Sequence, residues 1–229
     1  MEAQAPRIIY FVNEYGPLTH EHLCTLTRLH PISIRRILPR LVEAQKLSCA
    51  SQGMHKPHVY ATRDISKRKD FTHDLARATV ATALHNTGLL TYWTAPLQKF
   101  PKHKAVNEDA RFELTIDAGD KLAVLHFFLE VDTATEGIRQ IEDKFKRYLA
   151  LKDRSQVLFV LKFNPALPRR SRPATLAELA ERYIKPSDKH LWKKFLFADL
   201  DKFAADPTGQ ICHIPYSDQR YSILPSLVK

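Results

Sequence analysis

Leu18-Thr19-His20-Glu21-His22-Leu23-Cys24-Thr25-Leu26, followed after a short break by Ile32-Ser33-Ile34-Arg35-Arg36-Ile37-Leu38-Pro39-Arg40-Leu41-Val42-Glu43-Ala44, is the stretch that decides the fold of the N-terminal part. Its apolar residues recur at intervals of three and four, the spacing of one buried helix face. The next stretch, Leu47 to Tyr60, is polar and rich in turn residues. The order therefore predicts two short helices, a tight turn and a hairpin.

The second of these helices is expected to present basic side chains to the solvent. If its apolar stripe faces the core, the outward residues are Ser33, Arg35, Arg36 and Arg40. Arginine can bind guanine O6 and N7 with two hydrogen bonds when a helix lies in the major groove. Residues 1–66 are therefore interpreted as a winged helix-turn-helix that binds double-stranded DNA. The alternative is an ordinary helical hairpin with a solvated basic face. Pro39 is unfavourable inside a regular helix, because an internal proline removes a backbone hydrogen bond and destabilises the helix by roughly 3 kcal/mol.

Further basic residues follow the second helix. The hairpin tip carries His55, Lys56 and His58, and the segment after the hairpin carries Lys67, Arg68 and Lys69. We expect these side chains to contact phosphate groups, which fixes the position of a protein on DNA without reading its sequence. A solvated basic turn is the alternative for the second group.

Bulk composition agrees with a nucleic-acid partner. The chain has 229 residues, a formal net charge of +10, 44% hydrophobic and 26% charged residues. Such a basic balance favours a polyanionic partner. The first residues contain no apolar core of signal-peptide length, and no apolar run is long enough to span a bilayer. We therefore expect a cytoplasmic protein without membrane association. Three widely spaced cysteines argue against a disulfide framework and against a zinc site.

Residues 67–229 are expected to form a second, α/β domain, opened by a helix over residues 71–86. Strand-like alternation at residues 112–117 is followed by a turn and an apolar strand at residues 122–131. A helix from Thr135 or Glu136 to Leu151 should place Ile138, Ile141, Phe145, Tyr148 and Leu149 inward and Arg139, Lys144, Lys146 and Arg147 outward. The apolar strand 157–163 then completes a parallel crossover.

Three carboxylates form a second candidate site. Glu130 and Asp132 are two apart in one strand and so point the same way, and Asp117 can join them across the hairpin. Clustered carboxylates suit Mg²⁺ or Mn²⁺, which can activate water for phosphodiester cleavage. The alternative is that Glu130 and Asp132, with Thr133 and Thr135, cap the following helix.

Two family resemblances rest on these residues. Asp117, the hairpin and Glu130-Val131-Asp132 resemble the core of the PD-(D/E)xK nuclease superfamily, but Asp132 stands where that pattern has lysine. A carboxylate there would repel both water nucleophile and phosphate, so the departure favours a domain without cleavage activity. Phe128 to Glu136, Lys144-Phe145, Tyr148 and Phe195 to Leu200 are similar to the replication-relaxation family of plasmid and mobile-element proteins. That resemblance implies DNA binding linked to replication, transfer or relaxation, and a nuclease-like domain.

The sequence as a whole predicts a sequence-specific double-stranded DNA-binding protein of a plasmid or mobile element, acting in replication, relaxation or transfer, or transcriptional control. The expected partners are DNA, a second copy of the chain and a replication or relaxation protein, with no cofactor. The alternative is a Mg²⁺- or Mn²⁺-dependent DNA nuclease or nickase using Asp117, Glu130 and Asp132. A third hypothesis is a winged helix that binds protein instead of DNA.

Overall fold

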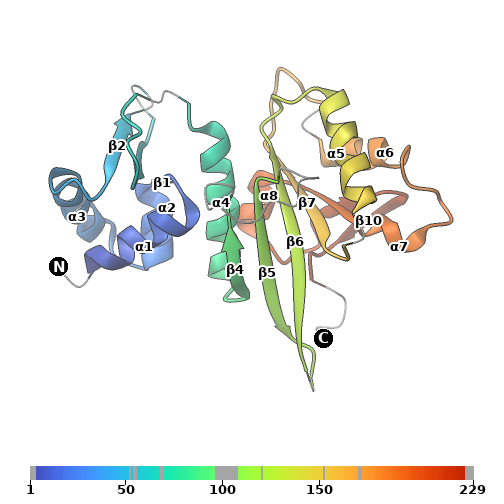
Figure 1. Ribbon diagram of the computed structural model, residues 1–229, viewed down its shortest axis with the longest axis horizontal. Helices are drawn as coiled ribbons and strands as arrows, with labels where there is room; N and C mark the ends of the chain where they lie inside the picture. Colours follow the sequence, from blue (N-terminus) through green and yellow to red (C-terminus); the bar gives the residue numbers. More distant parts are fainter. Residues whose placement is uncertain are drawn as a thin grey trace. The chain divides into compact units, whose positions relative to one another are not determined.

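The computed structural model describes residues 4–51, 53, 56–67, 70–95, 108–119, 121–151, 153–169 and 172–224 (Figure 1). The chain divides into two compact units, Met1–Asn86 and Thr87–Lys229. Together they form a mixed α/β protein with one large sheet and several helices. None of the described helices is both long enough and apolar enough to cross a lipid bilayer.

The first unit combines helices with a small antiparallel sheet. Its three strands lie in the order β1-β3-β2, and all of its pairings are antiparallel. The two helices and the hairpin lie in the order that the apolar spacing predicts. The elements are α1 (Ala5–Tyr15), β1 (Leu18–Thr19), α2 (His20–Thr27), α3 (Pro31–Glu43), β2 (Ser48–Ser51), β3 (His58–Ala61) and α4 (Thr72–Asn86).

The amphipathic pattern of α3 decides which of its faces is buried. Ile34, Ile37, Leu38 and Leu41 are buried, as their spacing predicts. Pro39 lies inside the helix, which continues to Glu43, so the proline does not end it. Pro39 is exposed, and its missing N–H leaves the ladder one hydrogen bond short on the solvent side.

Helix α4 belongs to the first unit, whereas the sequence analysis expected it to open the second. It packs against α2, where the ring of His22 contacts Thr79 with 3.1 Å between Nε2 and Oγ1. Near its end, His85 Nδ1 lies 3.0 Å from the hydroxyl of Tyr15 on α1. These contacts place the boundary after α4 and not near residue 66.

The second unit is built on a seven-stranded sheet of order β10-β9-β8-β7-β6-β5-β4. The three central strands β6, β7 and β8 run parallel, and the outer pairings are antiparallel. This confirms the expected parallel crossover from strand through helix to strand. The elements are β4 (Leu90–Thr94), β5 (Ala110–Asp117), β6 (Leu122–Asp132), α5 (Ile138–Ala150), β7 (Gln156–Leu161), α6 (Pro173–Ala180), α7 (Lys189–Trp192), β8 (Phe195–Asp199), α8 (Leu200–Ala205), β9 (Cys212–Ile214) and β10 (Ser217–Tyr221).

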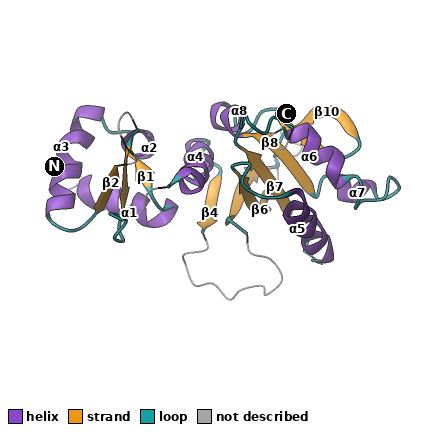
Figure 2. Cartoon of the chain, turned by 90° about the horizontal axis from the view of Figure 1, so that it is seen from above, coloured by secondary structure: helices purple, strands orange, loops and turns teal. Residues whose placement is uncertain are grey.

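Helices cover the central strands on both faces. One cluster joins Phe145 and Tyr148 of α5 with Phe159 of β7 and Phe197 of β8, and α6 contributes to the same cluster. Helix α8 packs against β7 and β8 on the other face (Figure 2). The apolar composition of β6 predicts burial on both faces, which holds only for the second half of the strand. Leu122 is 74% exposed, because the hairpin of β5 and β6 extends beyond the helices (Figure 1).

Candidate functional site

The outward face of α3 carries the predicted basic side chains. Arg35, Arg36 and Arg40 are exposed, while Ser33 is half-buried. The helix begins after His30, whose Nδ1 accepts a hydrogen bond from the amide of Ile32 at 3.3 Å. The buried apolar stripe fixes the rotation of the helix, so its guanidinium groups are directed to the solvent.

The hairpin and the segment after it are only partly described. Lys56 and His58 are exposed, and His58 Nδ1 lies 3.4 Å from Cys49 Sγ on the neighbouring strand. Lys67 is also exposed. The other predicted phosphate contacts, His55, Arg68 and Lys69, lie outside the described residues.

The structure separates Asp117 from the other two carboxylates, which corrects the predicted cluster. Asp117 pairs with Leu122 at the turn, where its Oδ1 accepts a hydrogen bond from the amide of Gly119 at 2.9 Å. Glu130 lies eight residues further along β6 than Leu122, or about 27 Å at 3.4 Å per residue. Asp117 is therefore a turn residue and cannot share a site with Glu130.

Asp109, which the sequence analysis missed, is the carboxylate that lies beside Glu130. Its amide donates to the carbonyl oxygen of Leu129 at 3.0 Å, and its Oδ2 accepts from the amide of Val131 at 2.7 Å. A signal for this was available. In an antiparallel hairpin the residue numbers of every pair have the same total, so the pairing of Asp117 with Leu122 continues to Asp109 opposite Glu130.

A lysine from α5 completes this site, although the sequence analysis placed it outward. Lys144 Nζ donates to Glu130 Oε2 at 2.6 Å and to Glu136 Oε1 at 2.7 Å. The hydroxyl of Tyr148 donates to Glu130 Oε1. Lys144 lies three residues after Ile141 and four before Tyr148, on the buried face of the helix. By contrast Ile138, expected inward, is exposed.

Burial dominates the electrostatics of the site. Glu130 is 1% exposed, and desolvation raises its pKa to about 7, against the opposing effect of the Lys144 ammonium group. The neighbouring Asp109 carboxylate also raises the pKa of Glu130. The negative charges of Glu130 and Glu136 raise the pKa of Lys144, although its burial acts in the opposite direction. Burial and the Glu130 carboxylate raise the pKa of Tyr148, which stays a neutral donor.

The alternative that Glu130 and Asp132 cap α5 is wrong. The residue before α5 is Gly137, whose amide donates to Gln140 Oε1 at 2.7 Å. Asp132 Oδ1 instead accepts from the amide of Ala134 at 2.7 Å, and the backbone of Ala134 has a φ of 61°. Asp132 therefore shapes the turn that leaves β6, where the nuclease pattern has its lysine. Neither Thr133 nor Thr135 caps α5, because Gly137 occupies the cap position.

The residues present do not fit a divalent cation. Across the described ranges, no three histidine, cysteine or acidic side chains are grouped so that they could hold a metal ion. Where such an ion would contact Glu130, the ammonium group of Lys144 lies between Glu130 and Glu136. Both carboxylate oxygens of Glu130 already accept hydrogen bonds. The site is therefore satisfied by an internal cation.

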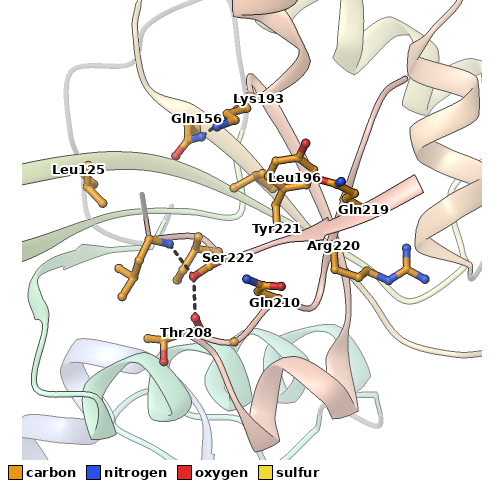
Figure 3. A pocket seen from close by; sticks show the side chains of 13 residues that line it. Leu125, Gln156, Lys193, Leu196, Thr208, Gln210, Gln219, Arg220, Tyr221 and Ser222 are labelled. Atoms are coloured by element: carbon orange, nitrogen blue, oxygen red, sulfur yellow. Dashed lines mark hydrogen bonds between the residues drawn. The ribbon is translucent and has the colours of Figure 1, made fainter. Parts of the chain in front are cut away.

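A hollow of about 970 Å³ lies elsewhere in the second unit (Figure 3). It is found near the first residues of β7 and β8, where Gln156 Nε2 donates to the carbonyl oxygen of Lys193 at 2.8 Å. On its other side, Ser222 Oγ donates to the carbonyl oxygen of Thr208 at 2.5 Å. None of the predicted site residues is among the described residues that line it.

The fold and these sites define a mixed α/β protein in which a small helical unit with an exposed basic helix is joined to a larger unit on a parallel-centred sheet. A family model described as replication-relaxation matches residues 44–158, just over half of the chain. The chain belongs to the replication-relaxation family, and membership indicates a role in plasmid or mobile-element replication or relaxation. The match contains Glu130, Lys144 and Tyr148 and begins after Glu43, the last residue of α3. Comparison with curated proteins and with solved structures found no match.

Proposed function

We propose that the chain is a sequence-specific double-stranded DNA-binding protein of a plasmid or mobile element, acting in replication, relaxation or transfer, or in transcriptional control. One observation carries the proposal. Arg35, Arg36 and Arg40 are exposed on a helix whose opposite face is buried. A rigid helix with exposed guanidinium groups can enter a major groove and bind guanine edges.

The surrounding elements support a winged helix-turn-helix over residues 1–66. Helix α2, a three-residue connection and α3 are followed by the hairpin of β2 and β3. In this arrangement α3 is the recognition helix, and Lys56, His58 and Lys67 are exposed near the hairpin to contact phosphate groups. His55, Arg68 and Lys69 are proposed for the same role from their sequence positions. Helix α4 would then stabilise this module by packing against α2.

The test is a fluorescence-anisotropy titration with the DNA around the chain's own gene. We expect Arg35→Ala and Arg36→Ala each to weaken binding to the preferred site roughly 5- to 150-fold, because a base-contacting arginine contributes about 1–3 kcal/mol. The preference over unrelated DNA should fall by the same factor. Arg154→Ala removes an equal charge from an exposed position in the second unit and serves as the matched control.

Unchanged affinity of both α3 variants would contradict the assignment. The salt dependence of binding distinguishes DNA binding from the hypothesis that the module binds protein. Phosphate contacts release counterions, so DNA binding must weaken steeply as the salt concentration rises.

A second copy of the chain and a replication or relaxation protein are proposed as further partners. Helix-turn-helix proteins commonly bind palindromic sites as dimers. Sedimentation of the protein alone and with a two-half-site duplex would show whether two copies bind each duplex. We propose the cytoplasm as the place of action, where a plasmid or mobile element would be replicated.

A DNA nuclease or nickase is the second candidate function. One observation favours cleavage. The nuclease motif has a lysine where this chain has Asp132, and Lys144 of α5 supplies a lysine beside Glu130 and Asp109. The poor fit for Mg²⁺ or Mn²⁺ opposes it. The test is incubation of supercoiled plasmid with the protein and either ion, beside Glu130→Ala. Nicking that needs the ion and is lost in the variant would establish cleavage; no nicking would remove this candidate.

A further inference from the structure

The segment after β7, residues 162–172, combines basic residues with an exposed aromatic ring. Phe163 is 51% exposed, and Lys162, Arg169 and Arg172 are exposed around it in the sequence. The chain has no acidic residue between Asp153 and Glu178. Aromatic and cationic side chains are the residue types that together bind single-stranded nucleic acid.

The position of this loop favours ligand binding. It leaves the carboxyl end of β7, one of the three parallel central strands, and in open α/β sheets ligands bind at that edge. The amide of Lys162 donates to the carbonyl oxygen of Asp132 at 2.9 Å, which ties the loop to the end of β6. The hollow of Figure 3 lies near the opposite ends of β7 and β8.

Local hydrogen bonds fix the backbone of residues 164–167 in the first part of the loop. Asn164 Oδ1 accepts from the amide of Ala166 at 2.9 Å, and the carbonyl oxygen of Asn164 accepts from the amide of Leu167 at 3.0 Å. Pro165 and Pro168 restrict their own φ angles. A loop ordered in advance loses less conformational entropy when it binds a ligand.

The acidic groups at the neighbouring strand ends already hold other partners. Asp199, which lies opposite Leu161, accepts from the amides of Asp201 and Lys202. The carboxylate of Asp132 is buried and accepts a backbone hydrogen bond within its own turn. The carboxylate of Glu136 is paired with Lys144. The exposed cations of the loop are therefore available to a polyanion.

We propose that the described residues of the segment after β7 bind single-stranded nucleic acid, with Phe163 stacking on a base and Lys162, Arg169 and Arg172 contacting the phosphates. The chemistry fits this ligand because every base offers a π-face and the backbone offers evenly spaced negative charges. A duplex keeps its bases stacked on one another and cannot offer them to Phe163. This surface is separate from the duplex-binding helix α3 and adds a second substrate form, such as an opened strand.

The experiment measures binding of the full chain to a fluorescent oligothymidylate of about 15 nucleotides, a length within the range that single-strand binding folds cover. We expect Phe163→Ala to weaken this binding roughly 5- to 150-fold, the range found when a stacking aromatic is removed. Phe163→Trp should retain it, because the ring is kept. Leu122→Ala, which truncates an exposed apolar side chain on the distant hairpin, should leave it unchanged.

An oligonucleotide of the same length with abasic sites separates stacking from charge. Wild type should bind it as weakly as Phe163→Ala binds the intact strand, and Phe163→Ala should cause no further loss. Arg169→Ala and Arg172→Ala should weaken binding to both strands. Each should reduce the slope of log affinity against log salt by about 0.7, the value for one phosphate contact on a single strand. Arg154→Ala is the control for charge.

The outcomes distinguish this proposal from the duplex function. Arg35→Ala should weaken duplex binding and spare the single strand, whereas Phe163→Ala should do the reverse. Equal affinity of wild type and Phe163→Ala for oligothymidylate would overturn the proposal, as would no binding by wild type. A poly-glutamate peptide that binds as tightly as the oligonucleotide would also overturn it, because the loop would then recognise charge alone.

Discussion

Lys144 Nζ lies 2.6 Å from Glu130 Oε2, so a cation from α5 neutralises a carboxylate at the end of β6. The lysine side chain is 16% exposed and the glutamate side chain 1% exposed. The pair joins the helix to the strand inside the segment that matches the family model.

Lys144→Met should destabilise the protein by about 3 kcal/mol at pH 8, because it leaves the Glu130 carboxylate buried without its cation. The loss should be smaller at pH 5, where Glu130 can take up a proton. Urea denaturation followed by circular dichroism measures both values. Lys146→Met is the control, since its ion pair with Asp143 is largely exposed and should contribute less than about 0.5 kcal/mol. Equal losses for the two variants would contradict the structural role of the pair.

The raised pKa of Glu130 makes stability depend on pH. Its pKa is raised from 4.5 to about 7, so between these values the folded state binds more protons than the unfolded state. The free energy of unfolding should therefore fall as the pH rises from about 5 to 7.5, by up to about 3 kcal/mol for this group. Glu130→Gln should remove that part of the dependence. A wild-type curve and a Glu130→Gln curve with the same slope would refute the shift.

Divalent cations should leave wild type unchanged and stabilise a variant without the lysine. In Lys144→Ala, Glu130 and Glu136 lose the cation that lies between them, and two carboxylates are enough to bind a divalent ion that keeps most of its water. We expect millimolar Mn²⁺ to raise the Tm of this variant by a few degrees, about 2–4 °C for each kcal/mol of binding energy. Glu130→Gln/Lys144→Ala should lose the effect. A Tm increase in wild type that Glu130→Gln abolishes would place an ion in the native site.

His22 should make the first unit sensitive to acid. Its Nδ1 accepts from the amide of Thr19 at 3.3 Å, so Nε2 carries the proton and donates to Thr79 Oγ1. Burial lowers its pKa from 6.5 to about 4. Below about pH 6.5 the unfolded state therefore binds more protons, and the free energy of unfolding should fall by up to about 3 kcal/mol by pH 4. His22→Gln should flatten this decrease in a urea series, whereas His126→Gln, on an exposed pair, should not.

Lys56→Ala and Lys67→Ala should weaken duplex binding uniformly across DNA sequences. Both side chains are exposed, and the proposal assigns them to phosphate groups. Each substitution should reduce the slope of log affinity against log salt by about 1 without changing the preference for the specific site. Anisotropy titrations at four salt concentrations measure the slope. Loss of site preference in either variant would mean that the lysine contacts bases instead.

Local patterns were enough to predict the elements that carry the basic surface. The apolar spacing of α3 fixes which side is buried, and the exposure of Arg35, Arg36 and Arg40 follows from it. The parallel crossover from β6 to β7 was predictable for the same reason, since strands and helices differ in their apolar period.

Only the tertiary structure decided which charged groups meet. The hairpin register places Asp109 instead of Asp117 beside Glu130, and the rotation of α5 brings Lys144 back to the same carboxylate. The packing of α4 on α2 likewise places α4 in the first unit and not, as its sequence position had predicted, in the second. The physical reason is that apolar periodicity along the chain indicates which face of a helix or strand is buried. The partner of a buried charge is instead set by pairing between segments far apart in sequence, which a single sequence encodes only through the folded whole.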